Sequence, residues 1–155
     1  MTLAELKEGV KAPDFKLIGS DDKEHSLIDY LGKQVVLFFY PKDNTPGWTN
    51  EAVSFRDSLS QIEDLNAVVI GISRDSITSH KKFIDKHQLP FILLSDSEEL
   101  VCNLYGVLKE KNMYGKKSIG IERSTFVIDE NGLVKKTFRK VKVDGHIGEV
   151  INALK

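Results

Sequence analysis

The hydrophobic residues of this chain fall into short uninterrupted runs separated by stretches with helical spacing. The runs Val35–Tyr40, Ala67–Ile72 and Phe91–Leu94 show little or no polar alternation, which is typical of strands covered on both faces of a parallel sheet. After the first run, apolar residues recur three or four positions apart, as on one face of a helix: Ala52, Phe55, Leu59 and Ile62. The pattern therefore predicts strands connected by helices.

Three more helices are predicted further along the chain. Ser73–Ser76 offers N-cap residues to a helix that carries Ile77, Phe83 and Ile84. A short helix after Ser95–Ser97 is expected to turn three residues inward: Leu100, Val101 and Leu104. A last amphipathic helix is predicted around Ile147, Val150, Ile151 and Leu154.

Turn signals place a hairpin at each end of this series. Asn131-Gly132 lies between the β-rich runs Ser124–Ile128 and Leu133–Phe138, and Asn-Gly in that setting is the strongest short hairpin signal. Near the N-terminus, the extended segment Lys16–Ile18 meets a polar turn at Gly19–His25. Together the elements indicate an α/β fold with a central mixed sheet flanked by helices and an added N-terminal hairpin.

Length and charge narrow the classes of function. The 155 residues fit one domain, residues 1–155. With 22 basic against 23 acidic residues and a net charge of −1, the chain has no basic footprint for nucleic acid. It has neither an apolar signal-peptide region near the N-terminus nor a run long enough to span a bilayer. We therefore expect a cytoplasmic protein, with no nucleic-acid or membrane partner.

The stretch Tyr40–Ala52, YPKDNTPGWTNEA, joins the first buried strand to the first long helix. It passes through Pro and Gly before the helix begins. A helix N-terminus presents unpaired backbone N–H groups and the positive end of the helix dipole. The stretch thus predicts a small anion site, and a thiolate would suit it.

This stretch resembles the peroxidatic loop of the peroxiredoxins, in the bacterioferritin comigratory protein or Q-type subfamily. Pro41 and Thr45 stand at the family positions, but Trp48 stands where the family has its peroxidatic cysteine. A second string of the subfamily, GIERSTF at Gly120–Phe126, follows at the expected distance. The resemblance implies a thioredoxin-like fold and a commonly monomeric enzyme without a cofactor. Such an enzyme reduces hydrogen peroxide and organic hydroperoxides with electrons from thioredoxin or another thiol.

The resemblance also implies roles for single residues. The Thr45 hydroxyl would hydrogen-bond the peroxide, Pro41 would shield it, and Arg123 would face the loop from a later strand. The resolving cysteine of many members lies five residues after the peroxidatic one, where this chain has Val53. In other members it lies in the following helix, where this chain has Phe83 and Ile84.

Trp48 cannot replace the thiolate, because indole is a hydrogen-bond donor only and has no sulfenic acid cycle. The chain as written should therefore be inactive. We expect the indole to be buried among Pro41, Phe39 and Phe126, and to occupy the peroxide pocket or push the first helical turn open. The single thiol, Cys102, is predicted to be buried and inert.

Three hypotheses about function stay open. In the first, the protein is a thiol or selenol peroxidase and Trp48 reflects engineering, cloning or reading of the gene. In the second, it is a natural pseudo-peroxidase that binds a ligand or a partner. A third, a structural or chaperone-like oligomer, has no positive feature in its favour. No metal is expected, because His80 and His87 lie about 10.5 Å apart along a helix, too far to chelate one ion.

Overall fold

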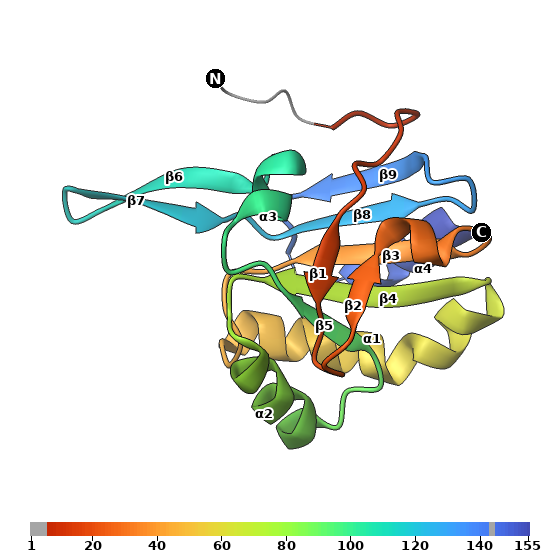
Figure 1. The fold of residues 1–155 in the computed structure, drawn as a ribbon, viewed down its shortest axis with the longest axis horizontal. Coiled ribbons are helices and arrows are strands. Elements are labelled where there is room, and N and C mark those ends of the chain that lie inside the picture. The colour runs from red at the N-terminus through yellow and green to blue at the C-terminus, as the bar shows by residue number, and fades with distance from the viewer. Residues whose placement is uncertain (1–5, 143–144) are drawn as a thin grey trace.

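In a computed structural model that describes residues 6–142 and 145–155, the centre of the chain is a five-stranded mixed sheet (Figure 1). The strand order is β5-β4-β3-β8-β9. The parallel strands are β3 (Gln34–Phe39), β4 (Ala67–Ser73) and β5 (Ile92–Ser95), and the antiparallel pair is β8 (Ser124–Ile128) and β9 (Val134–Arg139). The predicted α/β class with a mixed sheet is confirmed.

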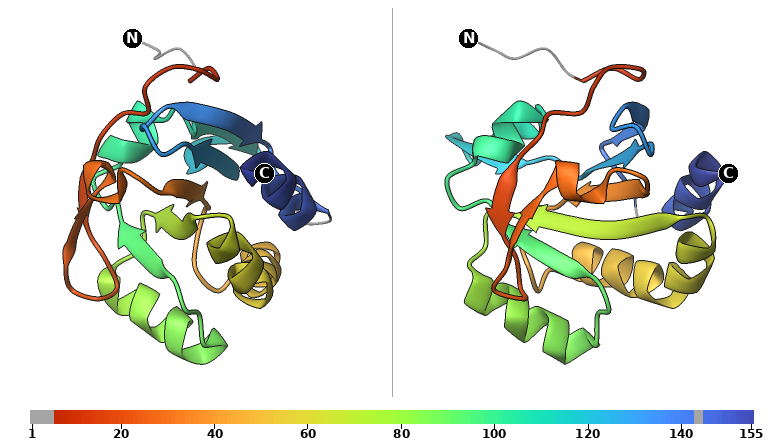
Figure 2. Two further views of the ribbon diagram at one scale, coloured as in Figure 1. Left: turned by 90° about the vertical axis from the view of Figure 1, so that its right-hand side faces the viewer. Right: turned by 45° about the vertical axis from the view of Figure 1, so that its right-hand side comes forward.

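Helices cover both faces of this sheet (Figure 2). One face carries the helices α1 (Pro46–Asp64), α2 (Ile77–His87) and α4 (His146–Leu154), and the other carries α3 (Leu100–Leu104). Alternate residues of β3 enter the two cores, so that Phe38 packs with the three helices and Phe39 with α3. All residues of β3 are buried, which explains its unbroken apolar run.

Two hairpins lie outside the central sheet. The predicted N-terminal hairpin pairs β1 (Lys16–Ile18) with β2 (Glu24–Ser26), and the 3-10 helix η1 (Leu27–Tyr30) follows it. A second hairpin, β6 (Leu108–Met113) with β7 (Lys116–Ile121), projects from the body and was not predicted from the sequence. No helix in the described part of the chain is both long and apolar enough to cross a membrane.

The expected orientation of α3 is partly wrong. Leu100 and Leu104 are 60% and 43% exposed, whereas Val101 and Cys102 are buried. The helix is little more than one turn long, so it can bury only a narrow side, which here is formed by Val101 and Cys102. The Asn131-Gly132 turn between β8 and β9 lies where it was predicted.

Candidate functional site

The loop that follows β3 leads directly into the N-terminus of α1. Thr45 is the N-cap, in an extended conformation, and Pro46 takes the first helical position. The N–H of Thr49 donates to the carbonyl oxygen of Thr45 at 2.8 Å and starts the helical ladder. The N–H groups of Gly47 and Trp48 therefore precede the ladder and can face an anion.

Arg123 lies against this helix start. Ser124 at the beginning of β8 pairs with Phe39 at the end of β3, which brings Arg123 beside the loop. A Cβ atom built on Gly47 would be 2.1 Å from Nη2 and 2.4 Å from Nη1 of Arg123. The guanidinium thus lies directly against Gly47, and a positive charge lies one residue before position 48.

The two other residues carried over from the resemblance flank the same loop. Pro41 and Thr45 are both half-buried. The Thr45 hydroxyl donates to the carbonyl oxygen of Lys42 at 3.0 Å and does not cap the helix. Its oxygen can therefore still accept a hydrogen bond.

Trp48 is fully buried, as expected, but its surroundings differ from the expectation. Its indole stacks on the Tyr40 ring, with the ring centroids 3.8 Å apart and an interplanar angle of 10°. The centroids of the Phe38 and Phe83 rings each lie 6.1 Å from that of the indole. Phe39 and Phe126, the predicted neighbours, belong to the core on the opposite face of the sheet.

Of the two effects expected of the indole, an opened first helical turn is wrong. The first turn of α1 is intact from Pro46 onward, because the Trp48 side chain points into the core between the sheet and the helices α1, α2 and α4. The cost appears elsewhere: no described residue offers a hydrogen-bond acceptor to the buried Nε1 of Trp48. A buried unsatisfied donor typically costs about 1–3 kcal/mol.

A buried acid lies one turn after Trp48. Glu51 is 4% exposed, and its Oε1 is 3.9 Å from Nε2 of His146, which in turn is 2.8 Å from the Thr125 hydroxyl. Burial raises the pKa of Glu51 to about 7, although the positive charge of Arg123 opposes the rise. Burial likewise lowers the pKa of His146 to about 4. The helical spacing of the apolar residues of α1 does not reveal that this acid is buried.

Replacing Glu51 with glutamine should stabilise the protein at alkaline pH. The pKa of Glu51 is about 7 in the folded chain, against an ordinary value of 4.5. The folded state therefore becomes less stable relative to the unfolded state as pH rises from about 4.5 to about 7, because the buried carboxyl group must then lose its proton. Glutamine has no charge to bury. We expect the free energy of unfolding to increase by up to about 3 kcal/mol above neutral pH and to change little at acidic pH. Urea denaturation at both pH values measures the difference.

The exposed Glu63, on the same helix, provides the matched control, and Glu63→Gln should show no such pH-dependent gain. His146 contributes the opposite slope, because a histidine pKa lowered from 6.5 to about 4 removes stability as pH falls through that range. An equal gain for Glu51→Gln at acidic and alkaline pH would contradict the assignment of a buried charge.

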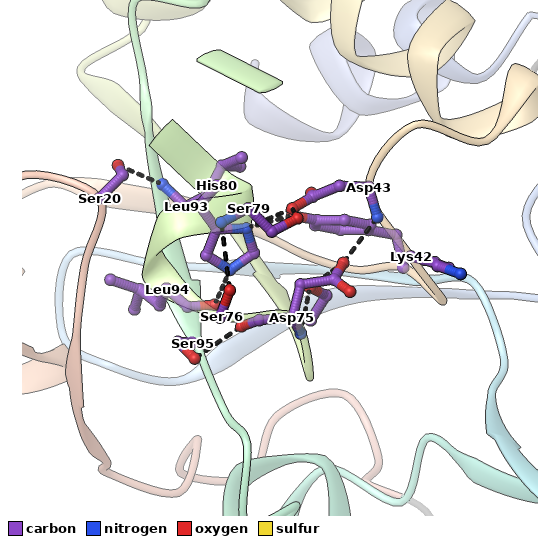
Figure 3. Close-up of polar contacts among 12 residues, drawn as sticks. Ser20, Lys42, Asp43, Asp75, Ser76, Ser79, His80, Leu93, Leu94 and Ser95 are labelled. Carbon is purple, nitrogen blue, oxygen red and sulfur yellow. Dashed lines mark hydrogen bonds and ion pairs between the residues drawn. The ribbon is translucent and has the colours of Figure 1, made fainter. Parts of the chain in front are cut away.

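A polar network holds the other side of the loop (Figure 3). Asp43, Asp75 and His80 bring potential metal-ligand atoms within 4.8 Å of one another. However, His80 Nδ1 and Asp43 Oδ2 are 2.8 Å apart and hydrogen-bonded directly, which leaves no space for an ion between them. The cluster thus fits a hydrogen-bond network better than a metal centre.

The single thiol, Cys102, and Val53, the predicted resolving position, lie away from the loop. Cys102 is buried in α3, in the core across the sheet from Trp48. Burial, and then the carboxylate of Asp96, raise the pKa of its thiol well above the ordinary range. Val53 is half-buried on α1, about 7.5 Å along the helix axis from position 48.

Comparison with known proteins identifies close relatives. Residues 9–137 match the AhpC/TSA family. The chain is 50% identical over 150 residues to peroxiredoxin Bcp of Bacillus subtilis, and the aligned region covers 97% of this chain and 96% of the relative. It is 43% identical over 155 residues to peroxiredoxin Bcp of Xanthomonas campestris, covering 100% of this chain and 97% of that protein.

Solved structures show the same similarity. A cysteine-to-serine variant of Xylella fastidiosa PrxQ has a TM-score of 0.92 at 42% identity, covering 98% of this chain and 97% of the other. A bacterioferritin comigratory protein of Xanthomonas campestris, studied for its alkyl peroxide reduction activity, has a TM-score of 0.90 at 41% identity, covering 96% and 97%.

Proposed function

This chain belongs to the AhpC/TSA family, in its bacterioferritin comigratory protein or peroxiredoxin Q subfamily, and we propose that it provides the frame of a hydroperoxide reductase. In its active form position 48 carries cysteine or selenocysteine. The substrates are hydrogen peroxide and organic hydroperoxides, and the electrons come from thioredoxin or another thiol. The protein acts as a single-domain monomer in the cytoplasm.

The placement of Arg123 against Gly47 is the observation that carries this proposal. It sets a guanidinium beside the N-terminus of α1, where two backbone N–H groups precede the helical ladder. These positive groups stabilise a thiolate or selenolate at position 48 more than the neutral acid. The relatives' names and the alkyl peroxide reduction of the Xanthomonas protein support the same chemistry.

The proposed roles follow from the positions of the side chains. The Thr45 hydroxyl accepts a hydrogen bond from the peroxide, Pro41 shields it from water, and Arg123 stabilises the developing negative charge. A sulfur–oxygen bond forms while the oxygen–oxygen bond breaks, and the electron pair of the broken bond leaves on hydroxide (from hydrogen peroxide) or alkoxide (from an organic hydroperoxide), which takes up a proton. The sulfenic acid is then reduced by an external thiol, because Val53 offers no resolving sulfur.

The chain with Trp48 is expected to show no hydroperoxide turnover with thioredoxin or dithiothreitol. Its only thiol is buried and has a raised pKa, so Cys102 carries almost no thiolate at neutral pH. Peroxide consumption should equal that of a Cys102→Ala variant. Robust turnover that disappears in Cys102→Ala would instead make Cys102 the nucleophile.

A natural pseudo-peroxidase is the second candidate, and one observation favours it. Trp48 is completely buried in a stack with Tyr40, as a residue adapted to this core would be. The unsatisfied Nε1 argues the other way. Because the codons of cysteine, tryptophan and selenocysteine differ only in the third base, the genomic codon for residue 48 decides: a tryptophan codon favours the pseudo-peroxidase.

A further inference from the structure

The buried carboxylate of Asp43 contacts three side chains: one from the residue that follows β3, and two from α2 (Figure 3). Its Oδ1 accepts from the Tyr40 hydroxyl at 2.7 Å, and its Oδ2 accepts from the Ser79 hydroxyl at 2.8 Å and lies 2.8 Å from Nδ1 of His80. Burial alone would raise the pKa of Asp43, but the hydrogen bonds, that to His80 foremost, lower it. The carboxylate is therefore ionised.

His80 has an acceptor on each side of its ring. Nδ1 faces the Asp43 carboxylate, and Nε2 lies 3.0 Å from the carbonyl oxygen of Leu94 in β5. A carbonyl and a carboxylate can only accept, so satisfying both contacts requires a hydrogen on each ring nitrogen. The fully buried ring is then an imidazolium paired with Asp43.

A second acid completes the surroundings of the pair. Asp75, between β4 and α2, accepts from the backbone N–H of Asp43 at 2.6 Å and from the Ser73 hydroxyl at 3.0 Å. The charged groups that face His80 are thus Asp43 directly and Asp75 behind it, and Tyr40 Oη lies 3.4 Å away. Hydrogen bonds of this network thus connect the loop after β3 with the segment after β4, with α2 and with β5.

The position of Asp43 gives this network a functional meaning. Asp43 lies between Pro41 and Thr45, in the loop that ends at the N-cap of α1. Tyr40, its hydrogen-bond donor, also stacks on Trp48. Any displacement of Asp43 would move the helix start and the Thr45 hydroxyl with it.

We propose that Asp43 and His80 are positioning residues of the site at position 48. Their buried ion pair fastens the loop to α2 and β5, and thereby fixes Thr45 and the first turn of α1 in the arrangement that accepts a peroxide. The catalytic part of this inference rests on the proposed function, whereas the ion pair and its effect on the loop do not.

The first test uses the unmutated chain. Nitrogen-15 NMR of the histidine rings at neutral pH should show a hydrogen on both nitrogens of His80. A neutral His80 ring with one bare nitrogen overturns the ion pair. The readout needs no variant, so a failure to fold cannot obscure it.

The second test compares Asp43→Asn and His80→Gln with His87→Gln, a matched control on the same helix. His87 is half-buried, and no described residue partners its Nε2. Amide hydrogen exchange across the loop and the first turn of α1 should be about tenfold faster in the first two variants and unchanged in the control. Equal exchange in all three variants overturns the positioning role.

The third test repeats these variants in a Trp48→Cys background. Asp43→Asn and His80→Gln should lower the rate constant for hydrogen peroxide on the order of ten- to a hundredfold, because a small displacement of the site has effects of this size. The pKa of the new thiol should change less than the rate constant, since the Arg123 guanidinium remains beside Gly47. Unchanged rates would overturn the positioning role. If Trp48→Cys itself is unreactive, the proposed function fails, while NMR and exchange still decide the ion pair.

Discussion

Replacing Trp48 with cysteine should create a thiol that reacts with hydrogen peroxide at least about a thousandfold faster than Cys102 does. The new side chain would meet the N–H groups at the start of α1 and the Arg123 guanidinium, which lower a thiol pKa and stabilise charge as it develops. Stopped-flow measurement of the reaction in a Trp48→Cys, Cys102→Ala chain isolates this one sulfur.

Two companion variants test the origin of that reactivity. Adding Arg123→Gln should lower the rate constant on the order of a hundredfold and raise the pKa of the new thiol. Adding Val53→Cys should suppress over-oxidation by forming a disulfide, provided that α1 unwinds locally, because the two sulfurs start too far apart to bond. A folded Trp48→Cys chain that reacts no faster than Cys102 would favour the pseudo-peroxidase.

Truncating the same residue to alanine should cost about 3–5 kcal/mol of unfolding free energy. Trp48 is among the largest fully buried side chains, and its removal opens a void lined by Phe38, Tyr40 and Phe83. Chemical denaturation followed by circular dichroism measures the loss, since the chain has one tryptophan and fluorescence disappears with it.

Trp48→Phe is the matched control for this loss. Phenylalanine keeps most of the aromatic contacts and removes the unsatisfied Nε1, so the two effects should nearly cancel, to within about 1 kcal/mol. A loss as large as that of Trp48→Ala would contradict this near-cancellation.

The central sheet could be predicted from the sequence because its strands carry clear patterns of apolar residues. All residues of β3 are buried on one face or the other, which produces an unbroken apolar run, and Asn131-Gly132 marks the β8–β9 turn. The β6–β7 hairpin gave no such signal. Most of the described side chains of β7 are exposed, so neither apolar alternation nor an apolar run marks it.

The candidate site also has a part that the sequence predicts and a part that it does not. The loop motif and Arg123 could be identified because each lies in a continuous string of residues. Asp43 and His80 could not be linked, because 37 positions separate them and only the packing of α2 on the sheet brings them together. The direction of the Trp48 ring also depended on packing: Tyr40 and Phe83 lie on the face of the sheet that α1, α2 and α4 cover, and the sequence does not say which face the side chain enters.

The stack of Trp48 on Tyr40 also gives the protein an optical label. The chain has one tryptophan, and its ring lies nearly parallel to a tyrosine in a rigid core. Because the two rings are held in one fixed arrangement, the tryptophan bands of the near-ultraviolet circular dichroism spectrum report on native side-chain packing around Trp48. A state that kept its helices but lost this packing would retain the far-ultraviolet spectrum and lose the near-ultraviolet one. The stack thus places a spectroscopic reporter in the first turn of α1, at the position proposed above for the reactive group.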